Sequence, residues 1–252
     1  MRGVQIWRSG VSQSPPEDVD TPVVGCLCYK ALSEWHLGEI VSCKAKLDEA
    51  ISLPKKLNDT NALAIALGWA AGIAYSQRNP AEADRLASDL TELATRHNLV
   101  YFLNLSAIGR GWARSASGNT AEGISLIEQG IRNLRETGTV LALPNYLARM
   151  AQAFHLADRT SEALEAINEA EALAERFEQR VYRATLHRLR GVFLAAIGAE
   201  ETQIEASFCE ASRIAKEQKS VPLTKRGEET YAEYRRQKAS GSGGHGFRIP
   251  LW

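Results

Sequence analysis

The sequence lacks an excess of charge of either sign. Its 252 residues include 30 Lys and Arg and 30 Asp and Glu, so the formal net charge at pH 7 is zero. Chains that bind nucleic acid or anionic membranes electrostatically usually carry a basic excess. Residues 219–252 hold seven basic and three acidic side chains, an excess too small to indicate DNA binding. The sequence therefore predicts neither nucleic acid nor a membrane as partner.

Long apolar runs and cysteines are also scarce. No apolar stretch approaches the roughly 18 residues that a membrane-spanning helix needs. Residues 1–20 contain no apolar segment of signal-peptide length, so we expect a cytoplasmic protein. Four cysteines are too few for a disulfide framework in a chain of this size, and we expect reduced, mostly buried thiols.

Motifs that carry catalysis or bind cofactors are missing as well. No G-x-x-x-x-G-K-[ST] phosphate loop occurs, and the GSGGHG run at 241–246 opens no strand or helix, so it predicts a flexible linker. Cys26, Cys28, His36 and Cys43 are of the residue types that bind zinc. Residues two apart on a helix point about 200° apart, so Cys26 and Cys28 would not converge on a metal. The sequence predicts no enzyme, no metal and no cofactor.

What the sequence does contain is a 40-residue internal repeat. One phrase, a polar turn followed by a helix with spaced small residues, occurs as QRNPAEADRLASDL (77–90), SGNTAEGISLIEQG (117–130) and ADRTSEALEAINEA (157–170). At this offset small residues coincide in three columns. The first column is Ala31, Ala71, Gly111, Ala151 and Gly191; the second is Cys43, Ala83, Gly123 and Ala163; the third is Ala50, Leu90, Gly130 and Ala170, broken only by Leu90. A fifth unit carries about three extra residues before Ala206.

Each repeat is interpreted as a helix–turn–helix unit. Small residues at fixed places let two helices approach closely, and apolar residues recur at helical spacing, as in Ile124, Ile127 and Ile131. Pro80 suits a first helical position, and Thr120 and Thr160 are plausible N-caps. One unit cannot cover its own apolar face, whereas stacked units can. The sequence therefore predicts an all-α fold, an α-solenoid of about five repeats.

The expected organisation has three parts: an extended leader (1–21), the solenoid (22–238) and a Gly/Ser-rich tail (239–252). First helices are predicted at 22–36, 60–76, 100–116, 140–156 and 181–197. Second helices are predicted at 40–56, 80–97, 120–137, 160–177 and 202–218, with a charged capping helix at 222–238. No segment is a good candidate for a strand.

The two ends of the chain suggest further contacts. The exposed flank of the first unit needs a cap, which Ile6 and Trp7 or a second copy of the chain, in a homodimer, would supply. The ending FRIPLW (247–252) places large apolar residues after the glycines. It could fold back onto the last helices or contact a partner, and we favour folding back.

Within each unit the second small residue lies twelve positions after the first, and the third lies seven positions after the second. This spacing resembles that of the tetratricopeptide repeat over about residues 25–218. The period is longer than the usual roughly 34 residues, and the helix-closing proline is missing. The strings GRGWARSASGNTAEGISLIEQGI (109–131), LHRLRGVFLAAIGAEETQIEASFCEA (186–211) and TYAEYRRQKASGSGGHGFRIPLW (230–252) resemble the C-terminal helical region of bacterial adenylate/guanylate cyclase–AAA/STAND ATPase regulators. The resemblance implies a sensor or scaffold part, without the cyclase and ATPase parts.

Tetratricopeptide solenoids usually bind along the concave face lined by the first helices. Carried onto this sequence, the groove positions are Trp35, His36, Tyr75, Trp112, Asn145, Gln152, His155 and Arg188. Trp, Tyr and Arg are enriched at binding hot spots. Alternatively, the aromatic residues fill gaps between repeats. The favoured function is a non-catalytic scaffold that binds a protein or peptide in bacterial signalling or transcriptional regulation. The alternative is a small-ligand sensor that acts with a separate ATPase or nucleotide cyclase.

Overall fold

A computed structural model describes residues 20–240, 247 and 249–251. The chain divides into two compact units, Met1–Arg110 and Gly111–Trp252, and the boundary falls inside one helix. Most of the expected leader, including Ile6 and Trp7, and the Gly/Ser run at 241–246 lie outside the described residues.

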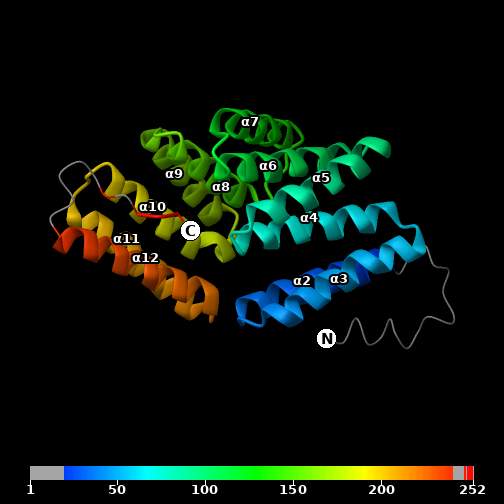
Figure 1. Cartoon of the computed structure of the whole chain (residues 1–252), viewed down its shortest axis with the longest axis horizontal. Coiled ribbons are helices and arrows are strands. Elements are labelled where there is room, and N and C mark those ends of the chain that lie inside the picture. The colour runs from blue at the N-terminus through cyan, green and yellow to red at the C-terminus, as the bar shows by residue number, and fades with distance from the viewer. Residues whose placement is uncertain (1–19, 241–246, 248, 252) are drawn as a thin grey trace. The chain divides into compact units, whose positions relative to one another are not determined.

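Unit 1 is built from helices joined by short turns (Figure 1). Its described helices are α2 (Asp20–His36), α3 (Ile40–Leu57), α4 (Thr60–Ser76), α5 (Pro80–Arg96) and the first part of α6 (Val100–Ala116). Apolar side chains of α2, α3 and α4 form one buried cluster that includes Val24, Leu27, Ala50 and Ala62. This packing buries the apolar faces that no single helix pair could cover alone.

Unit 2 continues the same architecture. Its described elements are the rest of α6, α7 (Thr120–Glu136), α8 (Leu143–Leu156), α9 (Thr160–Arg176), the 3₁₀ turn η2 (Arg180–Tyr182), α10 (Arg183–Ala196), α11 (Glu201–Glu217) and α12 (Val221–Ala239). Regular structure in the described residues is entirely helical, which confirms the predicted all-α class. None of these helices is both long and apolar enough to cross a membrane.

The helix ends follow a 20-residue rhythm that explains the repeat. Successive helices from α2 to α11 end at a residue with positive φ: Gly38, Asn58, Arg78, Asn98, Gly118, Gly138, Asp158, Glu178, Gly198 and Lys219. The next residue donates its backbone N–H to the carbonyl five positions earlier, as from Glu39 to Glu34 and from Ser220 to Ala215. This is the Schellman geometry, which satisfies carbonyls left open at a helix end. One residue is inserted between Gly198 and Lys219.

The predicted helix bounds agree with the structure to within three residues, and the largest difference is at α8. This helix begins at Leu143 instead of 140 because Pro144 occupies its first turn and Ala142 has a φ of 59°. Pro80 begins α5 as predicted, after Asn79, whose side chain accepts a hydrogen bond from the backbone N–H of Glu82. The predicted caps Thr120 and Thr160 are wrong. Both are the first helical residues of α7 and α9.

The first small-residue column lies inside the helix packing, as predicted: Ala31, Ala151 and the other members are buried. In unit 2 the backbones of α6 and α7 approach closely at Gly111 and Gly123. A Cβ atom on Gly123 would lie 2.4 Å from the carbonyl oxygen of Gly111. Only glycine allows this approach, because real Cβ atoms do not occur at such distances.

The fifth helix pair, α10 and α11, differs from the expected 40-residue spacing. Ala206 is exposed, whereas Ile204 and Phe208 are among the buried residues of α11 and lie one residue beyond the 40-residue register. The insertion is therefore one residue and not about three. A Cβ atom on Gly191 of α10 would meet the Phe208 ring at 2.7 Å, so an aromatic ring fills the space beside this glycine.

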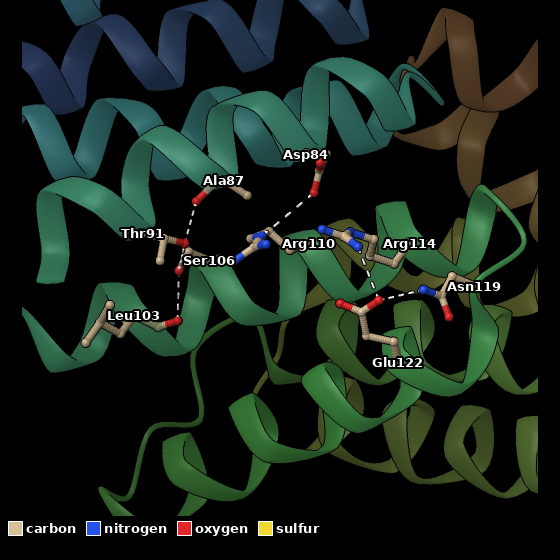
Figure 2. Close-up of polar contacts among 9 residues, drawn as sticks. All are labelled: Asp84, Ala87, Thr91, Leu103, Ser106, Arg110, Arg114, Asn119 and Glu122. Carbon is tan, nitrogen blue, oxygen red and sulfur yellow. Dashed lines mark hydrogen bonds and ion pairs between the residues drawn. The ribbon is translucent and has the colours of Figure 1, made fainter.

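Polar contacts accompany the packing of α6 against its neighbours (Figure 2). In unit 1 the Thr91 hydroxyl of α5 lies 2.9 Å from the Ser106 hydroxyl of α6, and Asp84 lies 3.8 Å from Arg110. In unit 2 the Arg114 guanidinium lies 3.2 Å from the Glu122 carboxylate of α7. The two ion pairs are partly exposed and contribute little to stability.

The last helix, α12, covers α11 with one face. Leu223, Gly227, Thr230 and Tyr234 are buried at helical spacing. Charged side chains lie on the opposite, exposed face, as predicted for a cap: Lys225, Glu228, Glu229, Arg235 and Arg236. The aromatic rings of Phe208, Tyr231 and Tyr234 stack where α11 meets α12.

Candidate functional site

The predicted groove residues of unit 1 are mostly buried. Trp35 exposes 4% of its surface and Tyr75 exposes 8%. His36 is half-buried, and its ring centroid lies 4.7 Å from that of Trp35. Burial lowers the pKa of His36, so the imidazole is neutral at pH 7. Trp35 and His36 are therefore in contact at the end of α2, and Tyr75 lies on α4; each is buried or half-buried.

In unit 2, two predicted groove residues meet across neighbouring repeats. The Trp112 indole Nε1 of α6 donates a 3.1 Å hydrogen bond to Gln152 Oε1 of α8, 40 residues along the chain. Trp112 exposes 1% of its surface and Gln152 exposes 4%. This bond satisfies a buried donor and a buried acceptor, so it holds the first helices of two repeats in register.

Two arginines lie buried on the first helices of unit 2. Arg188 of α10 was predicted from the sequence, whereas Arg149 of α8 was not. Each exposes 5% of its surface. Arg149 lies three residues before Gln152 on the same helix, so that spacing could have placed both on one face. Its guanidinium carbon lies 5.8 Å from the centre of the Tyr146 ring. Buried guanidinium groups require hydrogen-bond acceptors, since an unpaired buried charge is costly.

The remaining predicted residues lie elsewhere on α8. Asn145 is half-buried in the first turn of the helix. His155 is in the last turn, where its Nδ1 lies 3.0 Å from Thr160 Oγ1 and its ring lies 4.9 Å from that of Phe193. Burial lowers the pKa of His155, against an opposing effect of the Asp158 charge. At pH 7 this histidine is a neutral hydrogen-bonding group.

Phe247 and residues 249–251 lie on α10, where the end of the chain folds back as favoured from the sequence (Figure 1, red trace at C). We call these residues the docked segment. The backbone N–H of Phe247 donates a 3.1 Å hydrogen bond to the Ala195 carbonyl, and an Nη of Arg188 donates to the Leu251 carbonyl at 3.5 Å. Ile249 and Leu251 expose 3% and 5% of their surfaces, whereas Pro250 is exposed. Alternate side chains thus face the protein.

The two bonds fix which way the docked segment runs along α10. Ala195 and Arg188 are seven residues apart, about 10 Å along a helix. Four residue steps from Phe247 to Leu251 cover that distance at roughly 3.3 Å per residue. The segment runs opposite to α10, because its first residue lies at the helix end. The Phe247 ring also contacts that of Tyr234 on α12, edge-on, with centroids 4.8 Å apart.

The energetics of docking are close to balanced. Burying Ile249 and Leu251 contributes about 3–6 kcal/mol together, and two hydrogen bonds contribute about 1 kcal/mol each. Fixing the four described residues costs about 4–8 kcal/mol of backbone entropy. Because these terms are of similar size, another molecule can compete with the docked segment for α10.

Potential metal ligands and free thiols are dispersed among the described residues. Within residues 20–240, 247 and 249–251, no group of three or more His, Cys, Asp or Glu is placed to hold a metal ion. Burial raises the pKa of Cys28 to about 12, so this thiol is a poor nucleophile at pH 7. Cys28 and Cys43 are buried, but Cys26 and Cys209 are exposed, so only half of the thiols follow the sequence expectation.

A second concave feature lies between α7 and α8. It is an open depression of about 410 Å³ lined by Glu128, Ile131, Arg132, Arg135, Glu136 and Met150. Charges of both signs border it, and Arg135 also pairs with Glu169 of α9 at 2.5 Å. Because the depression is open, it does not resemble the enclosed pockets that hold small ligands.

Comparison with known proteins supports the fold. The crystal structure of Bacillus thuringiensis PlcR in complex with the peptide PapR7 and DNA matches with a TM-score of 0.63, over 89% of this chain and 75% of that chain. The sequence identity is 17%, so this likeness shows the fold alone. The predicted tetratricopeptide-like α-solenoid is thereby confirmed.

At the sequence level, an uncharacterized protein of Rhizobium meliloti (strain 1021) is 28% identical over 214 residues. The match covers 85% of this chain but 21% of that protein, so the chain spans about one fifth of the length of its relative. No protein-family model matches the chain.

Proposed function

We propose that the protein is a non-catalytic regulatory scaffold that binds an extended segment of a partner protein on the surface formed by α10 and α12. The observation that carries this proposal is the docked segment. Arg188 and Ala195 bond to its main chain, and alternate side chains are buried. Main-chain bonds provide affinity and side-chain pockets provide specificity in many modes of peptide recognition.

The comparisons agree with this proposal in kind. PlcR, which has the same fold, forms a complex with a peptide and with DNA. For this chain we propose a peptide or protein partner and no nucleic acid, because its charge is balanced. The proposed setting is signalling or transcriptional regulation in the bacterial cytoplasm. The other predicted groove residues, Trp35, Tyr75 and Trp112 among them, would act by keeping the repeats rigid.

A small-ligand sensor that acts with a separate ATPase or nucleotide cyclase is the second candidate. It is favoured by the resemblance of the sequence to regulators with those parts. The open form of the depression between α7 and α8 argues against it. A thermal-shift screen against nucleotides and metabolites tests this candidate, since a tight small ligand would raise the midpoint of unfolding.

Partner capture tests the main proposal. The full chain is used as bait in an extract of its source cells, beside the variants Arg188→Met and Arg213→Ala. Arg213 is an exposed residue of α11 that pairs with Glu210 and Glu217, so it serves as a matched control. We expect wild type and Arg213→Ala to retain the same proteins and Arg188→Met to lose them. Equal capture by all three would refute a role for this surface.

A further inference from the structure

We infer that the docked segment is an internal competitor for the partner site, and that the partner offers apolar side chains at every second position of an extended segment. This inference rests on the proposed function and adds the partner's chemistry and the regulation of the site. The pattern is read from the protein itself, in which the Phe247 ring contacts Tyr234 of α12, Ile249 and Leu251 are buried, and Pro250 is exposed.

The geometry limits what can replace the docked segment. An incoming peptide needs an N–H for the Ala195 carbonyl and, four residues later, a carbonyl for Arg188. Between these bonds it needs side chains that fill the space taken by Ile249 and Leu251. A residue without an N–H is tolerated at the position of Pro250, which is exposed. The expected partner motif is therefore aromatic, any residue, aliphatic, any residue including proline, aliphatic.

Tethering gives the docked segment an advantage over a free peptide. Seven residues, 240–246, separate Ala239, the last residue of α12, from Phe247. A short tether corresponds to an effective concentration on the order of millimolar. A free peptide of the same sequence must compete with that concentration, so the intact chain binds it weakly. Weakening the docked segment removes the competition and opens the site.

The experiment measures binding of a fluorescein-labelled peptide of residues 244–252 by anisotropy. It compares the full wild-type chain with the full Ile249→Asp/Leu251→Asp variant. We expect binding to the double variant to be tighter by about tenfold or more, because the tethered competitor is lost. Arg213→Ala, at an exposed position of α11 outside the docked segment, is the control and should bind the peptide like wild type. A peptide with the same two aspartates should bind none of the chains.

Two outcomes overturn the inference: equal affinity of the peptide for wild type and double variant, or no difference between the native and aspartate-bearing peptides. Circular dichroism checks that the double variant is folded. If it is not, the milder Leu251→Ser variant is used, for which we expect about threefold tighter binding. If the extract experiment shows capture that depends on Arg188 but the free peptide does not bind, this inference is refuted and the proposed function remains supported. If the peptide binds but capture does not depend on Arg188, the proposed function is refuted and the competition by the docked segment remains supported.

Discussion

Two helix crossings in unit 2 use glycine at equivalent places for different reasons. Between α6 and α7, Gly111 and Gly123 bring two backbones together, and a Cβ atom on Gly123 would lie 2.1 Å from Ser115 Oγ and 2.4 Å from the Gly111 oxygen. Between α10 and α11, a Cβ atom on Gly191 would meet only ring carbons of Phe208, at 2.7–2.9 Å. A backbone cannot move aside without shifting a helix, whereas a ring can turn. The same residue type therefore differs in how strictly it is required.

Among the variants that test this comparison, Gly123→Ala has the largest expected effect on stability. The new methyl group would meet the α6 backbone, so we expect a loss of about 3 kcal/mol or more in the free energy of unfolding. The gain in helix propensity, about 1 kcal/mol, would not offset this. Urea denaturation followed by circular dichroism measures the loss. Stability equal to wild type would show that α6 and α7 can separate at little cost.

At the other crossing, Gly191→Ala should be milder. The Phe208 ring must shift by part of an ångström, and overpacking of this kind costs about 1–2 kcal/mol before the helix-propensity gain. We expect a net loss of about 1 kcal/mol or less in the same assay. A loss as large as that of Gly123→Ala would contradict the distinction between ring and backbone.

Combining Gly191→Ala with Phe208→Leu sharpens the assignment to the ring. Phe208→Leu alone leaves space beside Gly191, and we expect it to destabilise. In the double variant the methyl group fills part of that space, so the loss should be smaller than the sum of the two single losses by about 1 kcal/mol. A double-mutant cycle in urea measures this coupling, and additive losses would show that Gly191 is required for another reason.

The smallest effect has the opposite sign. Gly68 of α4, in unit 1, has no close neighbour: a Cβ atom there would lie 3.8 Å from Leu90 Cδ2, which is ordinary contact. Gly68→Ala should therefore stabilise by about 0.5–1 kcal/mol, because alanine loses less backbone entropy in a helix. A raised thermal midpoint is the expected result. A lowered midpoint would mean that space alone does not decide the effect of a glycine in these helices.

The sequence predicted the repeat well because its cause is local. Small residues at a fixed offset and polar turns every 20 residues mark helix pairs whatever lies around them. It failed at α11, where Ala206 was taken for a column residue. The inserted residue lies just before α11, near Glu200 and Glu201, which are not typical turn residues. In addition, the residue packed against Gly191 is the large Phe208 and not another small residue.

The candidate site was harder to predict. Trp112 lies on a first helix, as expected, but its burial depends on Gln152, 40 residues away, whose hydrogen bond no local pattern indicates. Arg149 was missed because no groove position of the resembled repeat corresponds to it. The apolar ending after the glycines indicated that the docked segment would fold back. Its place beside Arg188 could be known only once α10 and α12 were placed.

The left-handed residue that ends each helix from α2 to α11 has a further consequence. Because every turn closes with the same backbone geometry, the main chain leaves each helix in the same direction relative to that helix. The one-residue insertion before α11 does not alter this, since the turn at Lys219 has the same geometry as the others. Length can therefore change in whole modules: a duplicated or deleted stretch of 40 residues would leave all remaining turns intact. The backbone geometry therefore permits the array to lengthen by internal gene duplication, whichever side chains each copy later acquires.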